Sequence, residues 1–251
     1  MKIGIALGGG GTRGFAHLGV LKALEEEGIV PDVVSGVSSG AMVGAFIASG
    51  KKPDEIMALM KDNKFLDYAK VRLPITGFFT LDKFEENIEK HLSVRAFSDL
   101  KLPFYVAVSN LYNGKVEYIH EGPLIPALQA SCSIPILFAP VEINGQLYVD
   151  GGLLDNLPYK PLVGQCDKIV AINILSPKET HKIGNLIEVA MRTFELSVGI
   201  NKEILEHECD LLIEPEGLEK YNILDTSRAE ELYSIGYDYC KKNDQIKRLF
   251  G

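Results

Sequence analysis

Five residues, Gly36-Val37-Ser38-Ser39-Gly40, join a short apolar run to a stretch of small residues, and they constrain the fold more than any other part of the chain. Residues 32–35 before them have the pattern of a buried strand, and residues 41–50 after them have the pattern of a helix that ends at a glycine. A turn this tight leaves no room for a Cβ at positions 36 and 40, two residues before and after the serine. The pattern therefore predicts an α/β fold in which Ser38 leaves the turn as an exposed nucleophile.

A second glycine-rich turn lies near the amino terminus, at residues 8–14. An apolar strand pattern covers residues 2–7 before it, and an amphipathic helix pattern covers residues 15–27 after it, closed by Gly28. Such a turn at the start of a helix points several backbone N–H groups at one spot. We therefore expect this turn to bind a negatively charged oxygen.

That oxygen belongs either to a dinucleotide or to a reacting carbonyl group. Gly9, Gly11 and Gly14 match the dinucleotide-binding pattern, and Asp32 follows at about the 20-residue spacing of that pattern. The ribose-binding acid, however, belongs at the carboxyl end of the second strand, whereas Asp32 precedes the strand. Because neighbouring parallel strands end at the same edge of a sheet, we favour a pairing of the two turns. Ser38 then faces an oxyanion hole of glycine amides, which predicts acyl transfer.

A serine nucleophile needs a base, and the five histidines of the chain are the first candidates. None lies in a glycine-flanked loop of the kind that positions a catalytic imidazole. We therefore expect all of them at the surface or at helix ends. They are His17, His91, His120, His181 and His207.

Asp150 is the stronger candidate for the base. Residues 141–149 have the pattern of a hairpin around Asn144-Gly145, and its second strand leads directly into Asp150-Gly151-Gly152. The two glycines allow another segment to approach the carboxylate closely. The alternative is an aspartate that only begins a turn, which is common before two glycines.

These three motifs together resemble the patatin-like phospholipase family. Similarity extends to residues 130–135 and 155–158, on either side of the aspartate, and to the first helix at residues 17–24. It is strong over residues 1–50 and 125–165 and weak elsewhere. The resemblance implies a three-layer α/β sandwich, with a mainly parallel central sheet and helices on both faces. It also implies a Ser-Asp dyad, without histidine, that acts on acyl esters of lipids.

The resemblance assigns a role to each motif residue. Ser38 is the nucleophile and Asp150 the general base, and a dry pocket that raises the pKa of the aspartate makes it a better base. The oxyanion hole comprises Gly9, Gly10, Gly11 and Arg13. The remaining motif glycines are Gly14, Gly36, Gly40, Gly151 and Gly152.

Two details of the glycine-rich turn stay open. Arg13 stands where the family has a basic residue, which steadies the turn or the charge of the substrate, or pairs with an acidic neighbour. Four consecutive glycines, residues 8–11, leave the choice of donating amides uncertain by one residue.

Composition sets the outer limits. With 251 residues, 46% of them hydrophobic, and no linker-like segment, we expect one domain over residues 1–251. A net charge of −8 argues against a nucleic-acid partner and against electrostatic attraction to anionic membranes. We expect a cytoplasmic protein without leader or membrane span, any membrane contact being peripheral, apolar and local. The four cysteines are far apart, so we expect reduced thiols and no metal site. We also expect no cofactor, and the oligomeric state is left open.

One segment, residues 63–80, is rich in large apolar residues without a clear period. It forms either a lid that contacts lipid or part of the core beside the nucleophile helix. The remaining patterns predict strands and helices. The strands are expected at residues 104–109, 116–119, 168–174 and 211–213, and the helices at residues 81–92, 123–132, 183–207 and 228–242.

Three functions compete. The first is a Ser-Asp hydrolase that cleaves acyl esters of lipids or, alternatively, small soluble esters. The second is an α/β-hydrolase with a histidine triad, which is disfavoured because Ser38 follows only two candidate strands. The third is a catalytically silent protein that binds lipid or regulates a partner.

Overall fold

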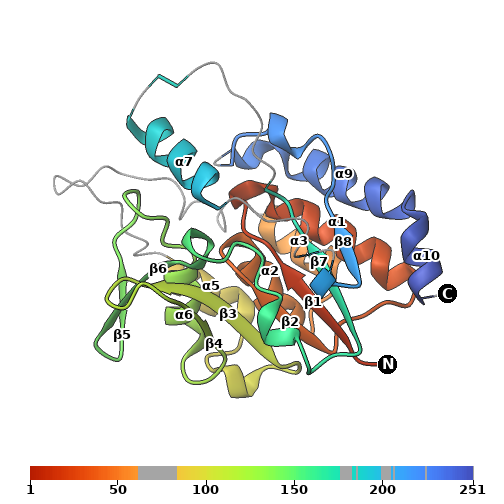
Figure 1. Cartoon of the computed structure of the whole chain (residues 1–251), viewed down its shortest axis with the longest axis horizontal. Helices are drawn as coiled ribbons and strands as arrows, with labels where there is room; N and C mark the ends of the chain where they lie inside the picture. Colours follow the sequence, from red (N-terminus) through yellow and green to blue (C-terminus); the bar gives the residue numbers. More distant parts are fainter. Residues whose placement is uncertain are drawn as a thin grey trace.

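The computed structural model describes residues 1–61, 84–175, 183, 184, 186–198, 205, 207–223 and 225–250. It shows a mixed α/β fold around an eight-stranded sheet (Figure 1). The strands follow the order β5-β6-β3-β2-β1-β7-β8, with β4 paired to β3. They comprise β1 (Ile3–Leu7), β2 (Val33–Gly36), β3 (Phe104–Asn110), β4 (Val116–Ile119), β5 (Val141–Ile143), β6 (Gln146–Asp150), β7 (Lys168–Ile172) and β8 (Leu211–Ile213).

The helices and short 3₁₀ turns connect these strands. The α-helices are α1 (Phe15–Glu26), α2 (Ser39–Ala48), α3 (Pro53–Lys61), α5 (Phe84–Leu92), α6 (Leu124–Ser131), α7 (Leu186–Ser197), α9 (Ala229–Lys241) and α10 (Asp244–Phe250). The 3₁₀ turns are η1 (Gly11–Gly14), η3 (Phe97–Asp99), η4 (Gly151–Leu153), η5 (Lys160–Leu162), η6 (Leu218–Lys220) and η7 (Thr226–Arg228). Within the described ranges, no helix is both long enough and apolar enough to cross a membrane.

The sheet is parallel in its centre and antiparallel at one side. Strand β1 pairs in parallel with β2 and β7, so that Leu7 lies opposite both Gly36 and Ile172. Strand β3 continues the parallel part, whereas β4, β5 and β6 pair antiparallel. The central strands are buried on both faces, which explains their apolar sequences without polar alternation.

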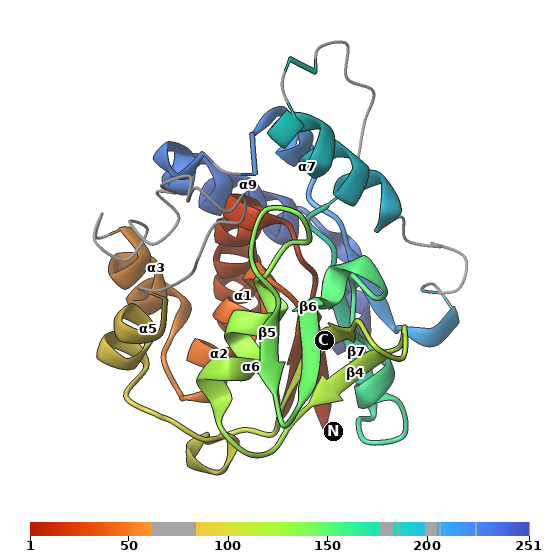
Figure 2. The same cartoon turned by 90° about the vertical axis from the view of Figure 1, so that its left-hand side faces the viewer.

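Two hydrophobic clusters lie on the two faces of this sheet. The larger includes Ile5 and Leu7 and packs under α1, α2 and α6, which Figure 2 shows together on one side of the sheet. The smaller includes Ala6, Val33 and Leu162 and is covered by η5 and its neighbouring residues. Because successive strand residues point to opposite faces, Leu7 and Ala6 belong to different clusters.

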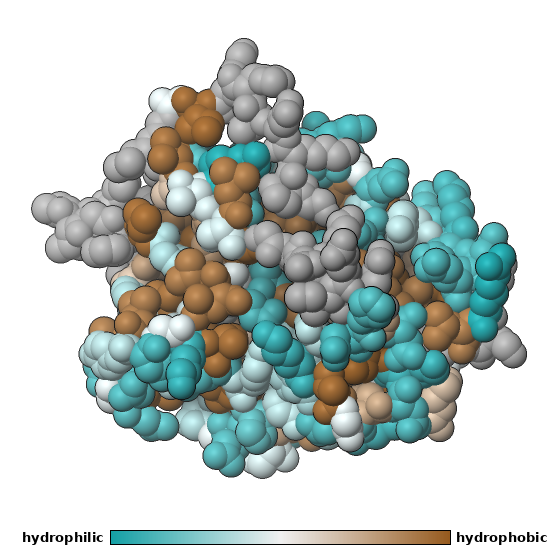
Figure 3. Space-filling model, viewed as in Figure 1, coloured by the Kyte–Doolittle hydropathy of each residue, from teal (hydrophilic) through white to brown (hydrophobic). Residues whose placement is uncertain are grey.

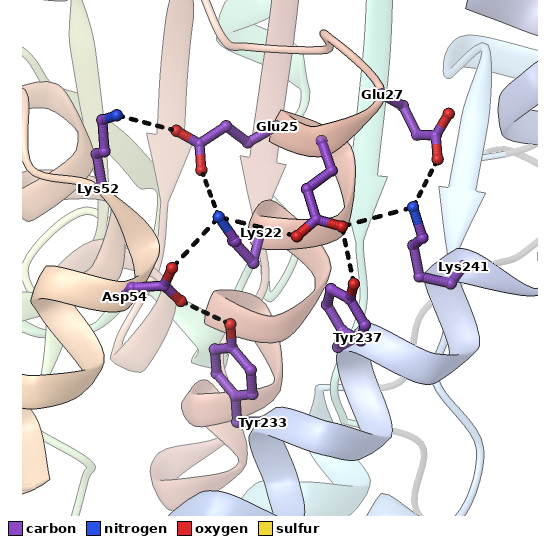
Figure 4. A network of polar contacts seen from close by, with 9 residues as sticks. Lys22, Glu25, Glu27, Lys52, Asp54, Tyr233, Tyr237 and Lys241 are labelled. Atoms are coloured by element: carbon purple, nitrogen blue, oxygen red, sulfur yellow. Dashed lines mark hydrogen bonds and ion pairs between the residues drawn. The ribbon is translucent and has the colours of Figure 1, made fainter.

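Helix α9 packs closely against α1. A Cβ on Gly236 would lie 2.1 Å from the Ala16 carbonyl oxygen, so only glycine permits this approach. A polar network lines the exposed side of the contact and extends to α3 (Figure 4). Lys22 lies 3.3 Å from Asp54, and the Tyr233 hydroxyl donates to the same carboxylate at 2.8 Å. Helix α9 is thereby attached to α1, the helix that follows the glycine-rich turn.

The observed elements agree with most of the sequence-based expectations. The hairpin turn occurs at Asn144 and Gly145, both with positive φ. Helices α3 and α10 were not expected. Of the long helix expected at residues 183–207, the structure describes α7 and a few later residues, and the apolar segment at residues 63–80 lies outside the described residues.

Candidate active site

Ser38 occupies a strained turn between β2 and α2. Its backbone has φ 53° and ψ −125°, a conformation that residues other than glycine rarely adopt. A Cβ on Gly36 would lie 2.6 Å from the Gly40 carbonyl oxygen, and a Cβ on Gly40 would lie 2.2 Å from the Leu7 carbonyl oxygen. The two glycines are therefore required by backbone-to-backbone contact, and they force Ser38 into the elbow geometry that the sequence predicted. The residue is only 8% exposed, so the expectation of an exposed serine was wrong.

A second serine supports this turn. The Ser38 N–H donates to Ser131 Oγ at 2.8 Å, and the Ser131 hydroxyl donates to the Ala107 carbonyl at 2.8 Å. Ser131 is fully buried at the end of α6. Sequence analysis placed it in a family-like stretch but gave it no role, because its partner Ser38 lies 93 residues away.

Asp150 lies beside Ser38 at the end of β6. Its side chain is fully buried, and Oδ1 accepts the Gly152 N–H at 2.8 Å. Burial raises the pKa of Asp150 to about 7, while the hydrogen bonds from Gly152 and from the Ser38 side chain lower it. The Ser38 contact is looser than a regular hydrogen bond, since Oδ2 has no partner at regular geometry. The structure thus brings the two predicted residues together.

The glycine-rich turn lies against Ser38. A Cβ on Gly9 would lie 3.3 Å from Ser38 Cβ. The Gly9 N–H already donates to the Asn156 carbonyl at 3.2 Å, whereas the N–H groups of Gly10 and Gly11 have no hydrogen-bond partner among the described residues. Of the predicted oxyanion donors, Gly10 and Gly11 are therefore the available amides.

Arg13 is buried and stabilises the glycine-rich turn through hydrogen bonds within the protein. It is only 5% exposed, and its Nε and Nη2 both donate to the Tyr221 carbonyl, at 3.2 and 3.0 Å. Nη2 also lies 3.8 Å from Glu195, and the Arg13 N–H donates to the Gly10 carbonyl. Both proposed structural roles, steadying the turn and pairing with an acid, occur together. Its N–H and guanidinium groups are engaged within the protein, so that Gly10 and Gly11 are the better candidates for oxyanion donors.

His17 does not lie where the sequence predicted. It is fully buried in α1 rather than at the surface or a helix end, and Nε2 lies 2.8 Å from the Gly8 carbonyl oxygen. Burial lowers the pKa of His17 to about 4, so the imidazole is neutral and Nε2–H is the donor. The prediction was wrong because the surrounding of a helix residue depends on the elements packed around it.

The other histidines agree better with expectation. His91 lies at the end of α5, while His120 and His207 are exposed. His181 lies outside the described residues. Asp32, the acid of the dinucleotide alternative, accepts the Ile3 N–H at 2.7 Å at the amino end of the sheet. It is therefore at the edge opposite to both glycine turns.

The remaining motif glycines mark close contacts between the turns. A Cβ on Gly14 would lie 2.9 Å from Ser39 Cβ, and one on Gly151 would lie 2.2 Å from the Ala107 carbonyl oxygen. A Cβ on Gly152 would lie 2.6 Å from Asn156 Oδ1 and 3.3 Å from Phe194 of α7. In both cartoon views α7 lies at the end of the sheet toward which β1 runs (Figures 1 and 2). Helix α7 therefore borders the candidate site.

Comparisons with known proteins find similar sequences and a similar fold. Residues 5–163 match the model of the patatin-like phospholipase family. The chain is 29% identical to lysophospholipase NTE1 of Saccharomyces cerevisiae over 272 residues, which cover 94% of this chain and 16% of that protein. It is 33% identical to an NTE family protein of Mycobacterium tuberculosis over 177 residues, which cover 69% of this chain and 49% of that protein. The chain thus spans half or less of the length of these relatives.

The crystal structure of VipD from Legionella pneumophila has a similar fold. The TM-score is 0.59 at 16% sequence identity, and the match covers 98% of this chain and 67% of that one. At this identity the likeness concerns the fold alone.

Proposed function

Because the chain belongs to the patatin-like phospholipase family, we propose that it hydrolyses acyl ester bonds of lipids through Ser38 and Asp150. The observation that carries the proposal is the position of the fully buried Asp150 carboxyl, which lies near enough to Ser38 for the serine side chain to lower its pKa. The N–H groups of Gly10 and Gly11, which have no partner among the residues that the structure describes, lie in the turn that packs against the same serine. A nucleophile, a base and oxyanion donors are thereby combined.

The proposed reaction has two steps. In the first, Asp150 takes the proton of the Ser38 hydroxyl while Oγ bonds to the ester carbonyl carbon, and the carbonyl electron pair moves onto oxygen. The N–H groups of Gly10 and Gly11 stabilise that oxyanion, and collapse of the intermediate releases the alcohol with the proton from Asp150. In the second, Asp150 takes a proton from water, which attacks the acyl-serine and releases the fatty acid as Ser38 regains a proton.

The environment of Asp150 suits this role. A carboxylate with an ordinary pKa of about 3.9 is a weak base toward a serine hydroxyl. Burial raises the pKa of Asp150 to about 7, which makes proton transfer less uphill while the carboxylate is still available near neutral pH. The proximity of Asp150 to Ser38 favours a dyad over a triad in which a histidine stands between the two.

The decisive experiment follows turnover of a short p-nitrophenyl ester. We expect Ser38→Ala and Asp150→Asn each to lower kcat at least about a thousandfold, because each removes a reacting group. The double replacement His181→Gln and His207→Gln is the matched control and keeps the activity. Full activity of either dyad variant would refute the dyad, and loss in the histidine variant would favour a triad.

A fluorophosphonate probe separates an enzyme from a silent lipid-binding protein, since it labels only an activated serine. We expect one adduct on Ser38 and none in Ser38→Ala. Absence of labelling in the wild type would favour the silent alternative. Turnover of defined phospholipids, monoacylglycerols and short esters under the same conditions then identifies the substrate class.

Contact with lipid is proposed through α7. Apolar side chains gather over this helix in the space-filling view (Figure 3), and Val189 and Leu196 are 45% and 58% exposed. We expect Leu196→Glu to weaken sedimentation with phosphatidylcholine vesicles while hydrolysis of a short ester is unchanged. Val30→Glu, at a comparably exposed position between α1 and β2, is the matched control. Equal vesicle binding by both variants would contradict this contact.

A further inference from the structure

Asn156 connects the glycine-rich turn to the segment that carries Asp150. It lies six residues after Asp150 and is 5% exposed. Its backbone carbonyl accepts the Gly9 N–H at 3.2 Å, and its side-chain Nδ2 donates to the Gly9 carbonyl at 3.3 Å. One residue therefore holds both polar groups of Gly9.

These two contacts determine where the Gly10 N–H points. The peptide bond between Gly9 and Gly10 is planar and trans, as every peptide bond of the described chain is, so its N–H is antiparallel to its C=O. Nδ2 of Asn156 fixes the direction of the Gly9 carbonyl, and the Gly10 N–H consequently points away from Asn156. That N–H, like the N–H of Gly11, has no partner among the described residues.

The carboxamide also fills the space between the two loops. Its Oδ1 would lie 2.5 Å from a Cβ on Gly9 and 2.6 Å from a Cβ on Gly152. Oδ1 therefore packs between the two glycines, and Gly152 in turn donates its N–H to Asp150. A shift of the Asn156 side chain would therefore displace both the glycine-rich turn and the segment that carries Asp150.

We propose that Asn156 is a positioning residue for the proposed hydrolysis: its carboxamide aims the Gly10 N–H at the oxyanion of the tetrahedral intermediate. It touches neither the substrate nor the Ser38 hydroxyl and acts through the Gly9–Gly10 peptide. The inference rests on the proposed function, because an oxyanion forms only when Ser38 attacks a carbonyl group.

The test uses Asn156→Asp, which keeps the size of the side chain and replaces the Nδ2 donor with an acceptor. A trifluoromethyl ketone is the probe, since Ser38 Oγ bonds to its carbonyl carbon, the electron pair moves to oxygen and the serine proton passes to Asp150. We expect kcat on a short ester to fall about tenfold to hundredfold with KM unchanged within about threefold. The inhibition constant of the ketone should rise by a similar factor.

Asn110→Asp is the matched control. Asn110 is equally buried, at 2% exposed, and its Nδ2 donates to Glu117 at 2.9 Å in the antiparallel part of the sheet. We expect this variant to melt at a lower temperature but to keep kcat and ketone affinity. Should Asn156→Asp fail to fold, Asn156→Ala removes the same donor without adding a charge and takes its place.

The outcomes separate the two proposals. Ser38-dependent turnover that keeps its kcat and ketone affinity in the Asn156 variant overturns the positioning role alone. A fall in melting temperature without a change in either quantity does the same, since it shows a merely structural residue. Absence of Ser38-dependent turnover in the wild type overturns the proposed function and, with it, this inference.

Discussion

The two strand-to-helix turns that meet at Ser38 are fixed in different ways. The elbow at residues 36–40 is held mainly by backbone packing, in which Gly40 lies against the Leu7 carbonyl. A side chain adds one hydrogen bond, which Ser131 Oγ accepts from the Ser38 N–H. The glycine-rich turn at residues 8–14 is held by polar contacts from several separate segments. They come from His17 on α1, Asn156 after η4, and the backbone of Tyr221 and Ile223 before α9.

This difference teaches what each turn tolerates. Backbone packing at van der Waals distance leaves no intermediate state, so a change in the elbow is accepted or rejected as a whole. Several independent hydrogen bonds weaken one at a time, so changes around the glycine-rich turn should shift activity by degrees. Each prediction below tests that contrast.

The largest effect is expected for Gly40→Ala. The new Cβ would lie 2.2 Å from the carbonyl oxygen of Leu7, at the end of β1, and 2.6 Å from that of Gly8, which follows it directly. We expect the free energy of unfolding to fall by more than about 3 kcal/mol, measured by urea denaturation. Gly28→Ala, which has φ 76° and no neighbour within 4 Å, is the control and should cost about 1 kcal/mol.

Gly11→Ala tests the other turn in the same assay. Gly11 has φ 59°, and its new Cβ would lie 2.3 Å from the Ile223 carbonyl oxygen. Because residue 223 belongs to a connecting segment rather than to the sheet, we expect a folded protein whose kcat is lowered about a hundredfold. If Gly11→Ala were as poorly folded as Gly40→Ala, the contrast between the turns would be lost.

The elbow could be predicted from sequence because its determinants are local. Two glycines, a serine and the flanking apolar runs lie close together in the sequence, and so do the determinants of the hairpin that leads to Asp150. The supports of the glycine-rich turn are long-range. Asn156 is 147 residues from Gly9, and Tyr221 is 208 residues from Arg13. No local pattern marks such a pair, and the burial of His17 likewise depends on packing that the sequence of α1 alone does not reveal.

The next effect is a pH dependence of turnover. Burial raises the pKa of Asp150 to about 7, and the proposed base is active only when deprotonated. We expect kcat/KM to fall about tenfold per pH unit below pH 7 and to level off above it. The melting temperature measured at each pH distinguishes protonation from unfolding. A rate that stays constant down to pH 5 would show a carboxylate with an ordinary pKa and would contradict the burial of Asp150.

The glycine-rich turn should respond at lower pH and through stability. Burial lowers the pKa of His17 to about 4, whereas the unfolded value is about 6.5. Between these values the unfolded chain binds a proton that the folded chain does not, so stability decreases as pH falls from 6.5 toward 4. From pH 7 to pH 5 this contribution amounts to about 2 kcal/mol.

His17→Gln isolates that contribution, because the glutamine amide retains a donor for the Gly8 carbonyl but does not titrate. Subtracting its unfolding free energy from that of the wild type at each pH cancels the other groups. Among them is Asp150. Because its pKa is raised in the folded protein, its contribution to stability increases as pH falls through 7, opposite to that of His17. A difference that does not change between pH 7 and pH 5 would place His17 in a wetter environment than the structure shows.

The smallest effect is expected for Thr12→Val. The Thr12 hydroxyl donates to the Asn222 carbonyl at 3.0 Å, while its N–H donates to the Ile223 carbonyl at 2.9 Å and is kept in the variant. We expect a loss of about 1 kcal/mol in unfolding free energy. We expect kcat to fall only about threefold, because the variant removes one hydrogen bond of the turn and keeps the others. Ser49→Ala, which removes a similar hydroxyl bond to Phe46 at the far end of α2, should cost as much stability and leave kcat unchanged. If the two variants have equal kcat, the contacts of the glycine-rich turn with residues 221–223 stabilise the fold without tuning the oxyanion donors, and graded control of activity belongs to Asn156 and His17 alone.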